Sequence, residues 1–372
     1  MVITRKIQKN IEKKMFNGKI IIIYGARQVG KTTLIKKIQE KYNQDSIYFN
    51  CDEPDIREAL TDKTSTELKF FLGNKKLILL DEAQRVKNIG LTLKLIIDNF
   101  PKIQIIATGS SSFELSNKVV EPLTGRKYEF YLYPFSLEEL QQLYSDLELD
   151  RILEKRIIFG MYPEIVNTNS KENLKSITRS YLYKDVVQYQ NIRNPEILEK
   201  LLQALALQIS NEVSYNELAD IIGVNKNTVA NYVQILEKAF IIFRLKPYSK
   251  NLRNELKKLR KIYFYDTGIR NALINNLNPL NLRQDVGSLW ENFIISERLK
   301  YNNNNNKDKQ IYFWRTLQQQ EIDYLEECNG KLSGFEFKWQ KNKFKKNQIF
   351  LTAYKNSSIE LINKYNYKNF VL

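Results

Sequence analysis

The stretch IIIIYGARQVGKTTLIKKI, residues 20–38, holds the residues whose types and spacing most clearly indicate chemistry. Its five leading apolar residues predict a buried parallel strand, followed by a glycine-rich turn and a helix opening at Thr32. Within it, the spacing G-x-x-x-x-G-K-[ST] occurs in the strand–loop–helix context that this motif requires. Glycines let the backbone wrap a phosphate, and the N–H groups of the loop and of the helix N-terminus then face the anion. The predicted nucleotide-binding loop comprises Gly25, Ala26, Arg27, Gln28, Val29, Gly30, Lys31, Thr32 and Thr33.

A second group of chemically competent residues follows the apolar stretch 77–80, in KLILLDEAQ. Ligands bind at the carboxyl ends of strands in open α/β sheets, so Asp81 and Glu82 are expected beside the loop. We expect Lys31 to reach the outer phosphates of ATP, and the Thr32 hydroxyl and Asp81 to hold Mg²⁺. Glu82 is predicted to orient or deprotonate the attacking water, because the chain has no histidine. An ordinary strand end with solvated acids is the alternative interpretation.

Polar side chains also end the next apolar strand, which lies in KIQIIATGSSS. At the same edge of the sheet, Thr108 and Ser110 would touch the γ-phosphate or the attacking water. A Ser/Thr turn without a chemical role is the alternative, because such turns are common.

Five short motifs together carry a resemblance to a known group of proteins. They are GARQVGKTT, LILLDEAQ, ATGSSS, LTGR at 123–126 and GMYPE at 160–164. In this combination the chain resembles the bacterial and archaeal AAA-type P-loop ATPases that carry a C-terminal domain of uncharacterised function. The resemblance covers nearly the whole chain. It implies ATP binding and hydrolysis and a small helical lid at 135–194, and it implies no particular substrate.

The resemblance also suggests a role for Arg126, which directly precedes the apolar stretch 127–133. AAA-type ATPases place an arginine there that reaches the nucleotide of a neighbouring subunit, and a fixed planar cation suits that task. Self-association through Arg126 is therefore predicted. A surface ion pair is the alternative.

The middle of the chain has the pattern of a helix-turn-helix. After an amphipathic stretch at 195–210, YNELADIIG predicts a short helix, and NTVANYVQILEKAF a longer one with Asn227 and Thr228 as its cap. The following IIFRLKPYSK would be a wing. Exposed side chains near the start of the longer helix, Lys226, Asn227 and Asn231, would meet a DNA groove. Winged helices also serve as protein docking modules, so both partners stay open.

A strongly basic run follows, KPYSKNLRNELKKLRK, with Glu255 as its one acid. Such a run can neutralise several phosphates, although a solvated linker helix is the alternative. Its seven bases are Lys246, Lys250, Arg253, Lys257, Lys258, Arg260 and Lys261.

Beyond residue 261 the spacing of acids is typical of a metal-dependent nuclease. Glu291 falls on an amphipathic helical stretch, Asp323 on one predicted strand, and Glu336 with Lys338 on the next. Strand alternation puts Glu336 and Lys338 on one face, and three carboxylates around one point favour Mg²⁺ or Mn²⁺. Lys338 would position or help deprotonate a water that attacks a phosphodiester. Alternating charge on a solvated strand face is the alternative. The set resembles restriction-endonuclease-like folds, although no proline precedes Asp323 and Trp339 follows the lysine.

Composition sets the outer limits. The 372 residues carry 58 basic and 42 acidic side chains, a formal charge of +16, which suits a polyanionic partner such as nucleic acid. Two distant cysteines give neither a disulfide framework nor a zinc site, which fits a cytoplasmic protein. Without histidine, triads and metal sites that need imidazole are excluded. No apolar run is long enough to span a membrane, and the asparagine tract 302–306 is expected to be a loop.

We therefore expect an α/β protein in four parts. These are a P-loop AAA-type core with a parallel sheet (1–134), a helical lid (135–194), a winged helix-turn-helix with a basic linker (195–261) and a small α/β nuclease-like domain (262–372). The predicted function is ATP hydrolysis on or near DNA. The alternative is a nucleotide-switched protein-interaction module whose nuclease-like domain is inactive.

Overall fold

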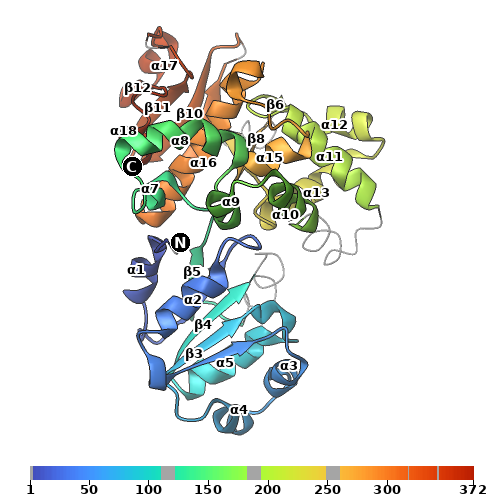
Figure 1. Cartoon of the computed structure of the whole chain (residues 1–372), viewed down its shortest axis with the longest axis vertical. Coiled ribbons are helices and arrows are strands. Elements are labelled where there is room, and N and C mark those ends of the chain that lie inside the picture. Colours follow the sequence, from blue (N-terminus) through green and yellow to red (C-terminus); the bar gives the residue numbers. More distant parts are fainter. Residues whose placement is uncertain (1–2, 110–121, 182–193, 249–259, 317, 342) are drawn as a thin grey trace. The chain divides into compact units, whose positions relative to one another are not determined.

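The computed structural model describes residues 3–109, 122–181, 194–248, 260–316, 318–341 and 343–372. The chain forms two compact units (Figure 1). The first unit consists of residues 2–134 with 238–240, and the second of residues 135–237 with 241–372.

The first unit is built on a five-stranded parallel sheet in the order β2-β3-β4-β1-β5. Strands β1, β3 and β4 are buried along their whole length, because helices and loops cover both faces, and such strands are continuously apolar. The parallel α/β core expected from the sequence is thereby confirmed. The strands are β1 (Ile20–Tyr24), β2 (Ser46–Asn50), β3 (Leu77–Asp81), β4 (Gln104–Gly109) and β5 (Lys127–Tyr131).

The helices of the first unit connect these strands. Helix α2 packs on β2, β3 and β4, and α1 packs on α2. Helix α4 begins with a capping box in which the Thr64 side chain accepts from the N–H of Glu67. The helices are α1 (Ile7–Glu12), α2 (Lys31–Gln39), α3 (Pro54–Leu60), α4 (Ser65–Leu72) and α5 (Ile89–Asn99).

The second unit contains a seven-stranded mixed sheet in the order β12-β11-β10-β9-β7-β8-β6. Strand β7 joins its two halves, pairing antiparallel with β8 and parallel with β9. The sheet therefore crosses the expected division between residues 261 and 262. Its strands are β6 (Glu212–Val213), β7 (Ile242–Pro247), β8 (Arg260–Phe264), β9 (Gln310–Arg315), β10 (Glu321–Cys328), β11 (Lys331–Phe337) and β12 (Ser357–Ile362).

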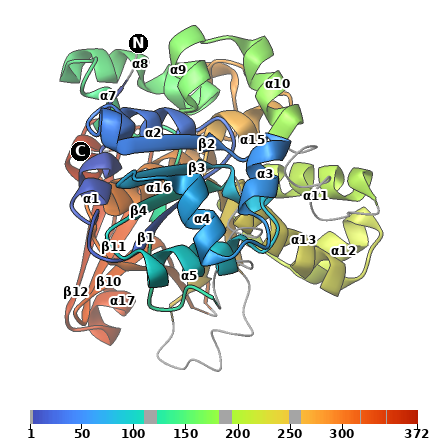
Figure 2. The same cartoon turned by 90° about the horizontal axis from the view of Figure 1, so that it is seen from below.

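Helix α16 is the central helix of this unit and packs on β8, β11, α8, α15 and α18. In both views the strands β10 to β12 lie to one side of it, and the group α11 to α13 lies to the other (Figures 1 and 2). The helices are α7 (Leu137–Leu140), α8 (Asp146–Phe159), α9 (Pro163–Thr168), α10 (Lys171–Tyr181), α11 (Pro195–Leu207), α12 (Tyr215–Ile222), α13 (Lys226–Lys238), α15 (Thr267–Leu273), α16 (Val286–Asn304), α17 (Gln348–Ala353) and α18 (Lys368–Val371).

The expected short and long helices of the middle region correspond to α12 and α13. Gly223 lies between them in the left-handed region, with φ 72°, a conformation that glycine adopts without strain. The predicted cap of the longer helix is wrong by two residues. The Asn225 side chain accepts from the N–H and the hydroxyl of Thr228, because α13 already begins at Lys226.

The predicted loop at 302–306 is also partly wrong, because α16 continues to Asn304. Asn302 is only 7% exposed, and its side-chain amide donates to the Glu326 carboxylate at 2.8 Å. A buried hydrogen bond of this kind outweighs the weak helix propensity of asparagine.

Among all the described residues, no helix is both long and apolar enough to cross a lipid bilayer.

Candidate functional site

The predicted nucleotide-binding loop connects β1 to α2, and its two motif glycines are required for different reasons. A Cβ on Gly25 would collide with the carbonyl oxygen of Leu132. Gly30 has φ 97°, which disfavours any other residue, and the space beside its Cα is open. The loop therefore packs closely at Gly25 and leaves open space beside Gly30.

Lys31 is buried at the centre of the loop. Its ammonium donates to the carbonyl oxygens of Gly25 and Ala26, each at 3.0 Å, and lies 3.9 Å from a Glu82 oxygen. These contacts hold the charge over the loop, at the position from which a lysine can reach the outer phosphates of a nucleotide.

Asp81, at the end of β3, accepts three side-chain hydrogen bonds. Its Oδ2 accepts from the Thr32 hydroxyl at 2.6 Å and from the Tyr48 hydroxyl at 2.9 Å. Its Oδ1 accepts from the Thr108 hydroxyl at 2.5 Å. Burial and the bond to Asp81 raise the pKa of Tyr48, so this hydroxyl stays protonated and keeps donating. The two expected Mg²⁺ ligands, Thr32 and Asp81, thus lie in direct contact, and their oxygen atoms are the type that Mg²⁺ prefers.

Glu82 follows Asp81 in the left-handed region, with φ 53°. Its N–H donates to the Thr108 hydroxyl at 3.0 Å, and its carboxylate accepts from the Gln84 amide at 2.5 Å. A non-glycine residue in this conformation stores backbone strain, which such hydrogen bonds offset. This backbone conformation places the Glu82 side chain beside Lys31 and turns it away from the direction of β3.

Of the two residues predicted at the end of β4, Thr108 lies inside this group. It bridges Asp81 and Glu82 and is fully buried. Ser110 lies outside the described residues. Sequence reasoning missed Tyr48 and also Arg5, whose guanidinium donates to the carbonyls of Val29 at 2.9 Å and Tyr133 at 2.6 Å. Arg5 thereby ties the loop to the segment after β5.

Arg126 and the nucleotide-binding loop lie at opposite ends of the strands of the sheet. It precedes β5, and β1 and β5 run parallel with Ile20 opposite Lys127, whereas the loop follows the other end of β1. The five residues of β1 separate these two ends by about 17 Å. The half-exposed Arg126 pairs with Asp98 of α5 at 2.7 Å. Its side chain therefore cannot reach the nucleotide loop of its own subunit.

A second group of charged residues lies in the other unit, where β10 and β11 pair. Their register sets Tyr324 opposite Phe335, so the next pair along is Asp323 and Glu336. The pairing of β10 with β9 is irregular between Ile322 and Leu325. Such a bulge commonly redirects a side chain at a functional site. Here it falls on Asp323, the first predicted carboxylate.

Lys338 completes this group. Its ammonium is 3.9 Å from Asp323 and 3.6 Å from Glu336. Asp323 is held in place by the N–H of Phe337 at 2.9 Å. Burial raises the pKa of Glu336, and the charge of Asp323 and a hydrogen bond with it raise that pKa further. Two carboxylates that oppose each other's ionisation in this way bind a shared proton or cation well.

Glu291 approaches the same place from α16, but another cation engages it. Lys261 of β8 lies 3.3 Å from Glu291 Oε1, and the Tyr263 hydroxyl donates to that oxygen at 2.6 Å. Burial raises the pKa of Glu291, and the charge of Asp323 adds to the shift, so these two acids are close. The structure therefore brings the four predicted residues into one charged cluster and adds Lys261, a member of the basic run that was predicted to bind a polyanion.

The residue after Lys338, which departs from the nuclease pattern, has a packing role. Trp339 packs edge-on against Trp290, with ring centroids 5.0 Å apart. Trp290 is the neighbour of Glu291 on α16. The aromatic pair thus joins the strand that carries Lys338 to the helix that carries Glu291.

A cavity of about 610 Å³ opens in front of Glu336 and Lys338. Lys345 and Lys346 add positive charge to its wall, and Phe344 adds an aromatic ring. Among the described residues, no group of three or more Asp, Glu, Cys or His side chains is positioned to hold a metal ion. A cation here would therefore rest on the Asp323 and Glu336 pair, with the remaining ligands from water or substrate.

The expected DNA-contacting residues Lys226, Asn227 and Asn231 are exposed on α13. Most of the basic run, residues 249–259, lies outside the described residues. Lys261 does not belong to a solvated run, because it is 2% exposed and forms ion pairs with Glu291 and Glu321. Its place on β8 turns it toward the interior of the unit.

GMYPE, one of the motifs behind the resemblance, has a structural explanation. A Cβ on Gly160 would collide with the Asp266 carboxylate, which accepts from the N–H of Met161 at 2.6 Å. Asp266 also caps α15 through the N–H of Ile269. The motif therefore joins α8 and α9 to α15, and we find no chemical role for it.

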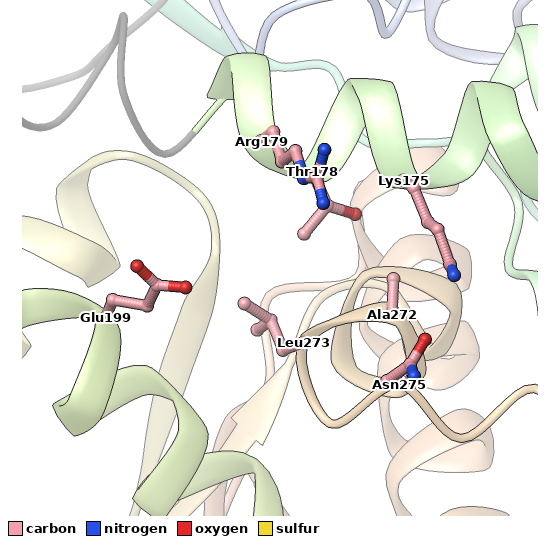
Figure 3. A pocket seen from close by; sticks show the side chains of 7 residues that line it. All are labelled: Lys175, Thr178, Arg179, Glu199, Ala272, Leu273 and Asn275. Atoms are coloured by element: carbon pink, nitrogen blue, oxygen red, sulfur yellow. The ribbon is translucent and has the colours of Figure 1, made fainter.

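A separate cavity of about 300 Å³ lies between α10, α11 and the end of α15 (Figure 3). Lys175 and Arg179 line it from α10, and Glu199 lies across it on α11. Neither cation has an ion-pair partner within the described part of the chain. Ala272 and Leu273 also line this cavity.

Comparison with known proteins supports the class of the first unit. Residues 17–141 match the family model of an AAA domain. Residues 150–280 and 286–366 match two domains of unknown function, DUF8612 and DUF4143. Most of the first unit is thus similar to the AAA domains of P-loop ATPases, a class that binds a nucleotide and usually Mg²⁺.

Several relatives are similar over most of the chain. Two uncharacterized proteins of Methanocaldococcus jannaschii are each 28% identical, over 78% and 79% of this chain and 69% and 70% of their own length. An uncharacterized protein of Mycobacterium tuberculosis is 24% identical over 90% of this chain and 73% of its own. The Pif1 helicase from Candida albicans aligns with 50% of this chain and 48% of its own, at 15% identity and a TM-score of 0.25. A score this low supports no inference about shared function.

Proposed function

We propose that this protein hydrolyses ATP in its first unit and acts on nucleic acid with its second, where Asp323, Glu336 and Lys338 form a Mg²⁺-dependent phosphodiesterase site. In the first unit, Lys31 binds the outer phosphates, Thr32 and Asp81 hold Mg²⁺, and Glu82 orients and deprotonates the attacking water. Thr108 supports this arrangement, because its hydroxyl donates to the Asp81 carboxylate and accepts from the backbone N–H of Glu82.

One observation carries the proposal for the second unit. Glu336 and Lys338 line a cavity of about 610 Å³, and Asp323 lies 3.9 Å from the Lys338 ammonium. Besides Glu321, the charged residues of the remaining wall are Lys345 and Lys346. A bound divalent cation would polarise a phosphodiester oxygen. Asp323 and Glu336 would hold that cation, and Lys338 would position the attacking water and help to remove its proton. Lys345 and Lys346, which line the same cavity, would bind the phosphates of a polyanionic strand.

The decisive experiment is a cleavage assay with the full chain on supercoiled, linear and single-stranded DNA and on RNA, with Mn²⁺ and ATP present. Asp323→Asn should lose cleavage and metal binding together, whereas Lys338→Ala should keep the metal and cleave about 100-fold more slowly. Lys331→Ala is the matched control, because Lys331 is exposed at the far end of the same strand. Intact substrates with the unmodified protein would refute catalysis.

Nucleic-acid binding is proposed to involve the exposed face of α13. Lys226→Ala should weaken DNA binding similarly across sequences. It should also reduce the slope of the logarithm of the binding constant against the logarithm of the salt concentration by about one. Lys155→Ala is the control, since Lys155 is exposed on α8, outside this face. An unchanged salt slope in Lys226→Ala would assign α13 to another partner.

A second candidate is an interaction module that cuts nothing. It is favoured by the lack of any three-carboxylate metal cluster among the described residues and by the ion pairs of Lys338 with both acids. In that case the cluster is a structural centre, and nucleotide binding switches a protein partner. A tight protein partner together with no DNA affinity would select this candidate.

A further inference from the structure

We infer that Lys261 is a buried cation within the group of carboxylates around Asp323 and Glu336, called the carboxylate cluster below. Lys261 fixes Glu291 in place and limits the cluster to one divalent cation, which Asp323 and Glu336 hold. This inference adds a positioning residue to the proposed phosphodiesterase site and rests on that proposal for the location of the metal.

The first support is the burial and pairing of Lys261. The side chain is 2% exposed, and its ammonium lies 3.3 Å from Glu291 Oε1 while also pairing with Glu321. The Phe313 ring lies 5.7 Å from the same ammonium and shields it from water. An ammonium in such surroundings is stable only because acids surround it. Lys261 therefore occupies a fixed place in the cluster.

The second support is that β8 engages a single oxygen of Glu291. Tyr263 lies two residues after Lys261, so both side chains project from the same face of the strand. Both donate to Oε1, at 2.6 Å from the Tyr263 hydroxyl and 3.3 Å from Lys261. Because Oε1 already accepts two hydrogen bonds, Glu291 cannot bind a cation with both of its carboxylate oxygens. It acts through its remaining oxygen or through water.

The third support is the balance of charge. In the described part of the chain, five carboxylates belong to this network of ion pairs, those of Glu212, Glu291, Glu321, Asp323 and Glu336. Three cations, Lys261, Lys338 and Arg315, pair with them. The sum is two formal negative charges. A single divalent cation balances that charge, whereas a second would meet two ammonium groups with no net negative charge left to offset it.

The test is a calorimetric titration of the full chain with Mn²⁺ in the absence of nucleotide. The unmodified protein should bind one Mn²⁺ that Asp323→Asn loses. Lys261→Met should bind Mn²⁺ about tenfold more tightly or take up a second ion, because Glu291 and Glu321 become uncompensated. Lys261→Arg, which keeps the charge, should behave like the unmodified protein. Glu291→Gln should weaken binding by less than tenfold, as expected for an indirect ligand.

Lys300→Met is the matched control. Lys300 is equally buried at 2% exposure and pairs with Glu297 at 2.6 Å, on the same helix as Glu291 but nine residues further on, about 13 Å away. It should cost stability, measured by thermal unfolding, without changing Mn²⁺ binding. Should Lys261→Met fail to fold, Tyr263→Phe provides the second measurement and should also tighten Mn²⁺ binding, because it frees part of Oε1.

Two outcomes separate this inference from the proposed function. If the unmodified protein and Asp323→Asn bind Mn²⁺ equally while Lys261→Met gains affinity, the phosphodiesterase proposal fails together with the placement of the cation on Asp323, and only the role of Lys261 in fixing Glu291 stands. If folded Lys261→Met and Tyr263→Phe bind Mn²⁺ as the unmodified protein does, or if that protein already holds two Asp323-dependent ions, Lys261 has only a structural role and the inference is overturned.

Discussion

At the end of β3, three hydroxyls from three different elements converge on one carboxylate. Thr32 lies in the first turn of α2, Tyr48 lies on β2 and Thr108 is the last residue but one of β4, and all donate to Asp81. The carboxylate is thus fixed before any ligand arrives. This reduces the ordering cost of binding a cation there.

Glu82→Gln should separate nucleotide binding from hydrolysis. The amide keeps the size and the hydrogen bond with Gln84 but cannot accept a proton, so we expect ATP binding within a few-fold of normal and turnover lowered at least about 100-fold. Steady-state phosphate release and nucleotide titration would measure the two effects. Lys31→Ala should lose binding as well. Normal turnover in Glu82→Gln would exclude it as the base.

Single residues also show how far sequence patterns go. The motif spacing predicted Lys31 and Thr32, because the loop geometry is local. The contacts of Tyr48 and Lys261 could not be predicted, since Tyr48 meets its partner through strand order and Lys261 meets Glu291 through the packing of α16 on β8. The Tyr48 partner lies on a neighbouring strand 33 residues later, and Lys261 meets Glu291 30 residues later. No local pattern encodes such contacts.

At the level of elements, the joint between α8 and α15 depends on one glycine. Gly160→Ala should lower the free energy of unfolding by about 3 kcal/mol or more, because its φ is 79° and a Cβ would collide with Asp266. Gly223→Ala is the matched control, with φ 72° and open space around it. It should cost about 1 kcal/mol. Equal losses, measured by urea unfolding, would contradict the proposed joint.

The link between α16 and β10 should make the second unit sensitive to acid. Burial alone would raise the pKa of Glu326, but the bidentate hydrogen bonds and charge of Arg298, with further bonds from Lys309 and Asn302, hold it at about 2. Relative to the ordinary value of 4.5, this pairing stabilises the fold by roughly 3 kcal/mol. The stability is present above pH 4.5 and is lost as the pH falls toward 2.

Unfolding measured between pH 5 and pH 2 would check this expectation. Glu326→Gln should be less stable near neutral pH, because Arg298 and Lys309 lose their partner. Its stability should also fall less steeply with acid. An identical pH slope in both proteins would show that Glu326 is not the group responsible.

Sequence patterns predicted most elements but not how the second sheet is assembled. Strand alternation predicted that Glu336 and Lys338 share a face, and the two charges lie 3.6 Å apart although Lys338 directly follows the end of β11. The stretch expected to be a wing became β7, which lies between β8 and β9 in the sheet. Pairing of this kind depends on residues 65 or more positions away, so neither periodicity nor turn residues reveal it.

At the level of the whole molecule, Arg126 bears on assembly. Because it lies at the sheet edge opposite its own loop, any catalytic role requires a second copy of the chain. Specific ATPase activity should then rise with protein concentration. Mixtures of Arg126→Ala and Lys31→Ala chains should recover part of the activity, since each supplies what the other lacks. Activity that is independent of concentration, with no recovery, would leave Arg126 as the surface partner of Asp98.

The continuity of the seven-stranded sheet has a practical consequence for anyone dividing this protein. A fragment that starts at residue 262 would lose β7 and the first two residues of β8, and β9 would then present a bare row of N–H and C=O groups. Unpaired edges of this kind recruit other chains. Such a fragment would also lack Lys261, leaving Glu291 and Glu321 without their shared counter-ion. Insolubility or metal binding seen with it would therefore describe a damaged sheet edge and not the native carboxylate cluster.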